Sequence, residues 1–442
     1  MKPWLPLLVG AVLIVQPGPR QVAITGGRVL DVASGRYRQA TLVTEGDRIA
    51  VVQPPETALP DNVTRIDASG QTIVPGLVDL AVQATPSADL DVSYFYALSL
   101  AHGVTSLRVI DGTLPWAAAQ RDRVREGEVL APRLFVSGPG ISTRSVVSSG
   151  APAEFGTDRP FVFASDPASV AREVARQVAA RVDWVRLRAD ASPDVVRAAS
   201  SAARQGRVRI SVSPGASTIG QLVQARVHAI DGLDGPSPPE ASSDDAVPRQ
   251  TPADPRTDAQ ALARARVTLI PLLRLDAERL GQDDARGREA ELKLMPDRLR
   301  KSREERRPPP QGDPRGWRAR VGLVKALAGQ RGAVGAGSGS TRDGWPVPGL
   351  ALHRELSALV AAGLSPADAI RAATATAAET LGVGGSLGQL RQGFRADLFI
   401  VRGDPLADVT ALREIVQVVR GGEVLDRQAL LASARRAAGP VR

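Results

Sequence analysis

Short apolar runs separated by glycine-containing turns follow the first residues of the chain and return near its end. Residues 21–54 alternate β-branched runs with such turns, a pattern that predicts three or four antiparallel strands. Residues 387–425 have the same pattern. We therefore expect the two ends of the chain to pair into one small β domain.

Between these ends the pattern changes to strands that alternate with helices. Residues 72–82 are almost continuously apolar, which is typical of a strand buried on both faces of a parallel sheet. Seven further runs have the length and composition of strands: 104–110, 133–138, 183–188, 208–213, 226–231, 267–273 and 333–338. Helical patterns separate most of them, for instance at 166–180, which begins with Asp-Pro. Eight such units in about 300 residues have the size and rhythm of a (β/α)8 barrel.

The expected architecture is therefore α/β: a (β/α)8 TIM barrel with a small β-sandwich formed from the N- and C-terminal segments. The predicted divisions are a signal peptide or anchor at 1–20, the first part of the β-sandwich at 21–72, the barrel at 73–385, the second part of the β-sandwich at 386–430 and a tail at 431–442.

Two segments interrupt the strand-helix rhythm. Residues 232–254 are rich in Pro, Ser and Asp and predict a long loop after the sixth strand. Residues 284–310 are dense in Arg and Glu and end in three prolines. For them we expect a solvated helix with a stiff exit rather than a site for a polyanion.

The first residues have the features of an export signal. Lys2 precedes an apolar run at 5–15, which is too short to cross a bilayer, since that takes about 20 residues. No clean cleavage site follows, so the segment is either a removed signal or an uncleaved anchor. We expect an exported, periplasmic protein that touches a membrane only through such an anchor.

Charge and composition narrow the choice of partners. The net charge of +9 comes almost entirely from arginine and could indicate nucleic-acid binding. Aromatic residues make up only 3% of the chain, and no basic stripe is interleaved with them as binders of single strands require. We therefore expect no nucleic-acid partner. The absence of cysteine excludes disulfides, thiolate nucleophiles and thiolate metal sites.

Three stretches of the chain resemble the amidohydrolase superfamily, in particular its imidazolonepropionase and prolidase-like members. The first two are IDASGQTIVPGLVDL at 66–80 and GVTSLRVIDG at 103–112. The third is the long block at 352–408, which begins LHRELSALVAAGLSPADAIRAATATAAETLG. This resemblance implies the barrel with its β-sandwich and a hydrolase of C–N bonds that binds one or two zinc ions. In such a site the metal lowers the pKa of bound water to about 7 and polarises the scissile carbonyl.

The family's metal ligands stand at the C-terminal ends of barrel strands. They are an H-x-H pair on strand one, often a carbamylated lysine on strand four, a histidine on each of strands five and six, and an aspartate on strand eight. At the matching positions this chain has none of these residue types. The replaced positions are Ala81, Gln83, Arg186, Ser213, Gly232 and Gly339.

A slip in the alignment does not restore the ligands. The chain has only three histidines, His102, His228 and His353, and none lies near Ala81 or between the first two. Arg186 stays protonated, so it cannot form the carbamate that lysine forms, and its charge repels a metal ion. We therefore expect no zinc or other cofactor, and we assign no catalytic residue.

Five polar residues remain as candidates for a residual pocket at the barrel mouth: Asp79, Asp111, Asp231, Asp343 and His353. The aspartates could pair with Arg186 and fill the place of the metal, or they could bind a charged ligand. For all three histidines we favour structural roles, with a contact at the mouth as the alternative for His353. Serine hydrolysis at Ser338 or Ser340 is disfavoured, because the sequence lacks a nucleophile elbow.

The function predicted from these residues is that of a pseudoenzyme, a non-catalytic barrel that binds a small molecule or a protein at its mouth. The alternative is an active hydrolase of C–N bonds, on non-peptide or dipeptide substrates, with a metal-free or atypical site. A third reading is a purely structural role, such as a subunit paired with an active homologue. A homo-oligomer is also compatible with the sequence.

Overall fold

The computed structural model describes residues 21–85, 90–114, 116–143, 161–188, 190–232, 254–281, 285–297, 299–301, 314–341 and 345–437. The expected signal or anchor at 1–20 and most of the predicted loop at 232–254 lie outside these ranges. Within the described part of the chain, no helix has the length and apolar character needed to cross a membrane.

Parallel strands form the centre of the molecule. The barrel strands are β8 (Leu77–Val82), β9 (Val104–Val109), β10 (Arg133–Val136), β13 (Trp184–Leu187), β14 (Arg209–Val212), β15 (Ala229–Asp231), β16 (Thr268–Ile270) and an eighth segment at 333–340. The seven named strands belong to two sheets, ordered β10-β9-β8 and β12-β11-β13-β14-β15-β16. Two further strands extend the second sheet beyond β13: β11 (Gly140–Ser142) lies next to β13, and β12 (Phe161–Phe163) lies at the edge.

Parallel bridges close these sheets into a barrel. Ser137 pairs with Trp184 between β10 and β13. The eighth segment joins β16 through Leu269 and Val334, and it joins β8 through Val82 and Ser340. The expected (β/α)8 barrel is therefore confirmed, and all eight predicted strands take part in it.

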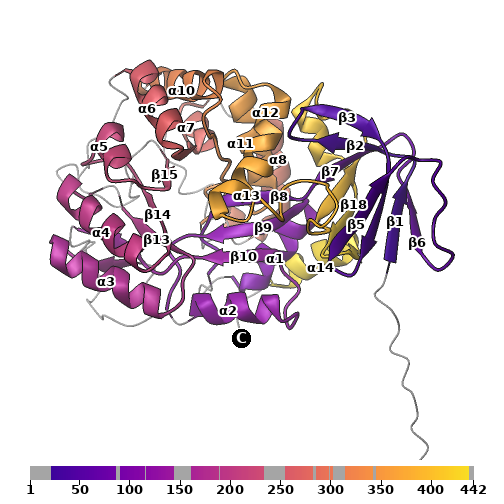
Figure 1. The fold of residues 1–442 in the computed structure, drawn as a ribbon, viewed down its shortest axis with the longest axis horizontal. Helices are drawn as coiled ribbons and strands as arrows, with labels where there is room; N and C mark the ends of the chain where they lie inside the picture. Colours follow the sequence, from indigo (N-terminus) through magenta and orange to yellow (C-terminus); the bar gives the residue numbers. More distant parts are fainter. Residues whose placement is uncertain are drawn as a thin grey trace, which may run out of the picture.

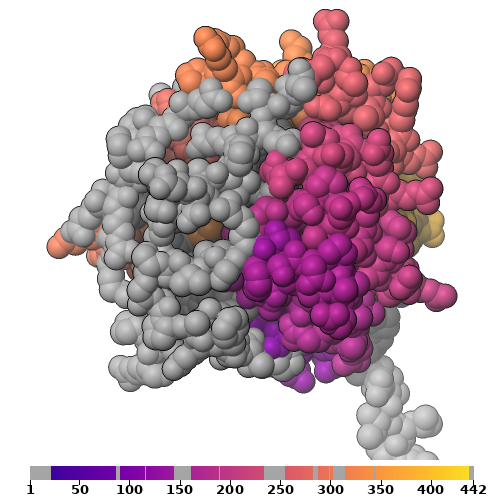
Figure 2. Space-filling view, turned by 90° about the vertical axis from the view of Figure 1, so that its left-hand side faces the viewer, coloured from indigo at the N-terminus to yellow at the C-terminus, as the bar shows by residue number. Residues whose placement is uncertain are grey.

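Helices pack around the barrel strands (Figure 1). Their bounds are α1 (Val92–Ala101), α2 (Trp116–Arg125), α3 (Pro167–Ala179), α4 (Pro193–Gln205), α5 (Ile219–Gln224), α6 (Pro255–Ala265), α7 (Leu273–Arg279), α8 (Ala285–Leu294), α10 (Pro314–Gly329), α11 (Leu350–Ala361), α12 (Pro366–Ala372) and α13 (Ala375–Leu381). Figure 2 shows the magenta segments of α3 to α5 side by side on one flank, with the red segments above them.

Helix α3 illustrates why these segments are helical. Asp166 caps its first turn and forms a capping box with Ser169, while Pro167 occupies the first helical position. Val170 and Val174, one turn apart, are buried on the face toward the barrel. The cap fixes the start of the helix, and the apolar face stabilises its packing.

The two ends of the chain form a β-sandwich beside the barrel (Figure 1). One sheet has the order β5-β4-β1-β6 and the other β19-β18-β17-β7-β2-β3. The bounds are β1 (Gln21–Thr25), β2 (Arg28–Asp31), β3 (Arg36–Gln39), β4 (Thr41–Glu45), β5 (Arg48–Gln53), β6 (Thr64–Asp67), β7 (Thr72–Pro75), β17 (Leu398–Val401), β18 (Ile415–Arg420) and β19 (Glu423–Leu425). Antiparallel pairing of β7 with β17 joins the two ends, and apolar side chains such as Ile24 and Ile400 fill the space between the sheets.

The apolar run at 72–82 is not the single strand that its pattern predicts. It divides into β7, which belongs to the β-sandwich, and β8, which belongs to the barrel. Gly76 stands at the change of sheet, where a Cβ atom would lie 2.2 Å from the Thr105 hydroxyl oxygen. A residue with a side chain would therefore separate β8 from β9 at this point.

Three other segments also differ from the expectation. Residues 21–54 form five strands instead of three or four. Helix α8, within the segment expected to be solvated, carries the fully buried Glu291. The expected tail contains most of α14 (Arg427–Ala437), which packs against α1 and buries Leu430 and Ala434.

Candidate functional site

Arg186, on β13, lies at the centre of a charged network at the C-terminal end of the barrel. Its Nη1 donates to the Asp111 carboxylate at 2.5 Å, and its Nη2 donates to the Ser213 hydroxyl at 2.9 Å. Its Nε lies 3.4 Å from Asp231. Burial opposes the charge of Arg186, but Asp111 and Asp231 outweigh it and raise the pKa of the guanidinium.

Asp231, at the end of β15, also binds a second arginine. The Arg108 guanidinium lies 2.5 Å from Asp231, donates to the Leu80 carbonyl at 2.5 Å, and stacks 4.8 Å from the Trp184 ring centroid. Ser211 donates to the other Asp231 oxygen at 2.6 Å. Arg108 and Asp231 are both fully buried, so their pairing keeps either charge from being left alone in the interior.

Asp111 follows β9 in the left-handed backbone conformation, with φ 54°. Besides Arg186, it accepts a hydrogen bond from the Gln83 amide at 3.1 Å, and Arg188 lies 3.7 Å away. Asp111 therefore connects residues from β8 and β13 across the barrel mouth.

Asp79 takes no part in this network. Its carboxylate accepts from the backbone N–H groups of Ala81 at 3.1 Å and Ser338 at 2.8 Å. Burial raises the pKa of Asp79 to about 6, against these hydrogen bonds. The Ser338 hydroxyl lies 2.9 Å from that of Ser340. These contacts join β8 to the eighth barrel segment.

The six positions that match the family's metal ligands all lie at the C-terminal ends of barrel strands. Gln83, Arg186 and Ser213 meet in the charged network. Gly339 donates its N–H to the Ala81 carbonyl at 2.9 Å, and the N–H of Gly232 donates to Ile270 at 2.7 Å. The structure thus gathers these positions at one end of the barrel.

Zinc in proteins is bound by imidazole, thiolate and carboxylate groups. Ala81, Gly232 and Gly339 have no such group, and the Ser213 hydroxyl is bound by Arg186. Within the described ranges, no three His, Cys, Asp or Glu side chains form a group that could hold a metal ion. The residues at these positions therefore do not fit a zinc ion.

The histidines lie apart from the charged network. His353 contacts the His102 carbonyl at 2.8 Å, and His102 contacts the Leu98 carbonyl at 2.8 Å. Burial lowers the pKa of His353 to about 3 and that of His102 to about 4, so both rings are neutral at pH 7. His228 accepts from the Ile210 N–H at 3.2 Å. Asp343 lies outside the described residues.

The sequence patterns did not single out Arg108 as part of the site. Its signal was a charged residue within a buried strand, between Leu107 and Val109. Such a residue needs a partner, since an isolated charge is costly to bury. The partner, Asp231, stands 123 positions away, so only the fold identifies it.

A second group of buried charges lies between α7, α8, α10 and α11, and the patterns did not predict it. The ion pairs are Arg354 with Glu291 at 2.7 Å and Arg320 with Asp276 at 2.9 Å. Glu355 accepts from two backbone N–H groups at the start of α7. These contacts connect the helices on this side of the barrel.

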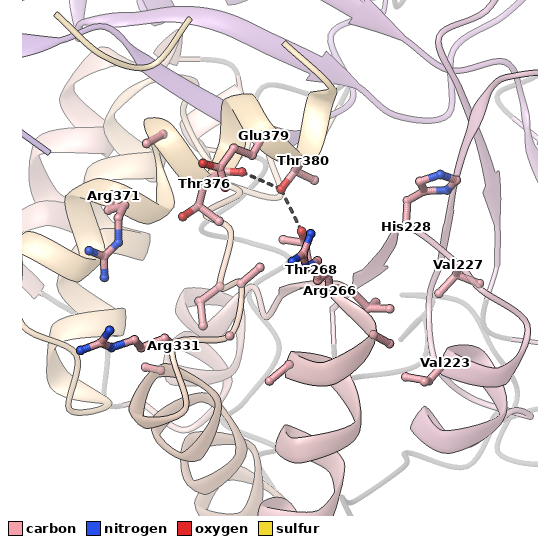
Figure 3. A pocket seen from close by; sticks show the side chains of 18 of the residues that line it. Val223, Val227, His228, Arg266, Thr268, Arg331, Arg371, Thr376, Glu379 and Thr380 are labelled. Carbon is pink, nitrogen blue, oxygen red and sulfur yellow. Dashed lines mark hydrogen bonds between the residues drawn. The ribbon is translucent and has the colours of Figure 1, made fainter. Parts of the chain in front are cut away.

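A cavity of about 1390 Å³ opens at the other end of the barrel (Figure 3). Its walls come from the turns that lead into β14, β15, β16 and the eighth segment, and from α12 and α13. No residue of the Arg186 network lines it. The two features are therefore separate.

Residues 347–425 match the model of the amidohydrolase family. Adenine deaminase 2 of Rhizobium etli is 34% identical over 134 residues, which are 28% of this chain and 22% of that protein. The matched part thus spans less than a quarter of that relative's length.

Two solved structures extend the likeness over nearly the whole chain. Molinate hydrolase superposes with a TM-score of 0.69 at 16% identity, covering 94% of this chain and 96% of that one. A Xaa-Pro dipeptidase with bound methionine gives 0.68 at 17% identity, covering 92% and 100%. At such identities the superpositions establish the fold alone.

Proposed function

We propose that this chain is a member of the amidohydrolase superfamily whose mouth has exchanged the family's metal site for the Arg186 network and serves as a binding site without hydrolysis. Its homologues include hydrolases such as adenine deaminase. The occupant we propose is a small molecule or a protein that docks at the C-terminal end of the barrel.

The observation that carries this proposal is the place of Arg186. Its guanidinium joins Asp111, Asp231 and Ser213, and these groups come from three different parts of the barrel. An arginine remains protonated at all ordinary pH values, so it supplies neither a carbamate nor a lone pair. A cation ordered by two carboxylates also opposes the approach of a divalent metal.

A second candidate is a hydrolase of C–N bonds that works without a metal. Asp79 favours it, because burial raises its pKa to about 6, within the range that suits a general base or acid near neutral pH. The Ser338 and Ser340 hydroxyl groups lie in the eighth barrel segment, whose backbone contacts Asp79 at Ser338. Against this candidate, Asp79 already binds two backbone N–H groups.

Metal analysis combined with activity assays tests the proposal. The protein is purified without chelators, its zinc content is measured by mass spectrometry, and simple amides, lactams and dipeptides are offered as substrates before and after added zinc. We expect well under one zinc per chain and no turnover. One zinc or more per chain with turnover would overturn the proposal, and turnover without zinc would favour the second candidate.

The variant Arg186→Lys is the matched control, since lysine can in principle form a carbamate. With no other ligand restored, we expect this variant to remain free of zinc and inactive as well. If the variant bound one zinc per chain, the mouth would hold enough other ligands for the metal. Arg186 alone would then prevent zinc binding in the unchanged protein.

A further inference from the structure

The cavity at the N-terminal end of the barrel is lined mainly by arginine. Six arginines and His228 face it, against two carboxylates, Asp368 and Glu379. Figure 3 shows Arg331 and Arg371 on one side and His228 on the other. The lining therefore carries a strong excess of positive charge.

Among the residues that the structure describes, several of these arginines have no counter-ion. Within the described ranges, neither Arg266 nor Arg331 forms an ion pair or side-chain hydrogen bond, and the same holds for Arg226 and Arg209. Arg371 pairs with Asp368, in contrast. Burial lowers the pKa of Arg209, and no carboxylate opposes this effect.

Three of the cavity arginines stand at a costly backbone position. Arg226, Arg266 and Arg331 have φ angles of 58°, 54° and 55°, and each follows a helix and precedes a barrel strand. This left-handed position is usually filled by glycine, because a side chain there costs about 1–2 kcal/mol. The repeated arginine places a cation at successive turns around one end of the barrel.

The neutral polar groups of the cavity add no negative charge that would oppose an anion. Burial, together with Arg209 and Arg204, lowers the pKa of His228 to about 4, so its ring is neutral at pH 7. The hydroxyl groups of Thr268 and Thr380 lie 2.9 Å apart, and Thr380 donates to the Thr376 carbonyl at 2.7 Å, so both protons are used within the protein. The cavity volume of about 1390 Å³ is larger than the roughly 300–1,000 Å³ of common small-molecule sites. It therefore has room for more than a single phosphate.

We propose that this cavity binds a small organic molecule with two or more phosphate groups, held by the arginines of the strand-leading turns. Guanidinium groups bind phosphate oxygens in pairs, and Arg226, Arg266 and Arg331 are exposed, so their guanidinium groups are open to a ligand. The cavity shares no residue with the mouth, so this proposal does not depend on the proposed function.

Calorimetric titration with inorganic tripolyphosphate and with a nucleoside triphosphate tests the inference. We expect saturable binding of one molecule per chain that weakens with added salt. The double variant R266Q/R331Q should bind at least about tenfold more weakly, as expected for the loss of charged hydrogen bonds.

The control is R264Q/R391Q, which removes the same charge at two exposed arginines outside the cavity. It should bind as the unchanged protein does. No saturable binding, or an equal loss in both double variants, would overturn the proposal, since only general electrostatic attraction would then remain. If R266Q/R331Q fails to fold, R266K/R331K keeps the charge but loses the paired geometry and should still weaken binding.

A third titration distinguishes the source of the phosphate groups. Vesicles of phosphatidylglycerol with a phosphoinositide bind if the headgroup of a lipid can enter the cavity. If soluble polyphosphate competes with the vesicles, both ligands bind to the same arginines. Binding to vesicles alone, unaffected by R266Q/R331Q, would contradict the site.

Discussion

Arg186 pairs with two buried carboxylates, Asp111 and Asp231, of which Asp231 is also paired with Arg108. Asp111 is fully buried and relies mainly on Arg186, since Arg188 lies farther away, at 3.7 Å. In Arg186→Met we expect the free energy of unfolding to fall by about 3 kcal/mol or more, as found when one partner of a buried pair is removed. Urea unfolding at neutral pH measures the change.

The double variant R186M/D111N provides the control for that prediction. It removes one of the carboxylates along with its partner, so part of the lost stability should return. A fall of less than about 1 kcal/mol in the single variant would contradict the prediction, because a surface ion pair has about that value.

His353 predicts a pH dependence of stability. Its pKa is lowered from 6.5 to about 3 by burial, with His102, Arg413 and Arg427 contributing repulsion. Below pH 6.5 the His353 ring therefore binds a proton in the unfolded chain but not in the folded protein, so stability falls as the pH drops. Relative to His353→Gln, the unfolding free energy should fall by roughly 2 kcal/mol between pH 7.5 and pH 5.

Guanidine unfolding of both proteins across this range measures the difference. The comparison with the variant is essential, because Glu291 and Glu355 change the unfolding free energy in the opposite direction to His353 as the pH falls. Burial raises the pKa of each to about 7, so their contribution is lost as the pH rises. A constant difference between the two proteins would show that the His353 ring titrates in the folded protein as it does in the unfolded chain, which would contradict the lowered pKa.

At the scale of elements, the turns before the barrel strands carry a cost that can be measured. Arg266 ends α6 in the left-handed conformation, with φ 54°. In Arg266→Gly we expect a gain of up to about 1 kcal/mol, since glycine adopts this conformation without strain but loses more entropy on folding. Thermal and urea unfolding should both show this gain in stability.

Arg264→Gly gives the matched control, two residues earlier and inside α6. Glycine within a helix costs about 1 kcal/mol, so this variant should be less stable than the unchanged protein. If both variants were destabilised alike, the left-handed strain at Arg266 would be negligible.

Which elements could be predicted depended on how local their determinants are. The eight barrel strands were evident because each is a short apolar run between helices. The break between β7 and β8 was not, because it depends on Gly76 meeting Thr105 from another strand. The burial of Glu291 also escaped the pattern, since its partner Arg354 lies 63 positions away on another helix.

The same distinction holds for the site. The replaced ligand positions could be named from the sequence because they stand in motifs with known spacing. The contacts of Arg186 with Asp111 and Ser213 require the closed barrel, and so does the part played by Arg108. The cavity arginines were visible only as an excess of charge, since their shared left-handed turns appear only in the folded chain.

On the scale of the whole molecule, an ion pair connects the barrel to the β-sandwich. Arg133 of β10 binds both carboxylate oxygens of Asp397, at 2.7 and 3.1 Å, and the Gly421 N–H also donates to Asp397. In Asp397→Asn we expect about 2 kcal/mol of lost stability, below the value for a fully buried pair because Arg133 is partly exposed.

Limited proteolysis alongside urea unfolding measures this effect, and Asp404→Asn is the comparison. Asp404 binds the Tyr37 hydroxyl within the β-sandwich at 2.5 Å and is more exposed. We expect Asp404→Asn to lose less stability than Asp397→Asn. Equal stability of Asp397→Asn and the unchanged protein would mean that Arg133 and Asp397 do not hold the two parts together.

The pairing of β7 with β17 also means that β7 is synthesised long before its partner strand. Thr72 and Gly403, which bond at this junction, stand 331 positions apart. At about 5–20 residues per second, β7 waits roughly 15–65 seconds on the ribosome before its partner is made. Throughout that time one edge of β7 is unpaired and can accept a strand from another nascent chain. We therefore expect chaperones that bind unpaired strands to act on the newly made N-terminal segment.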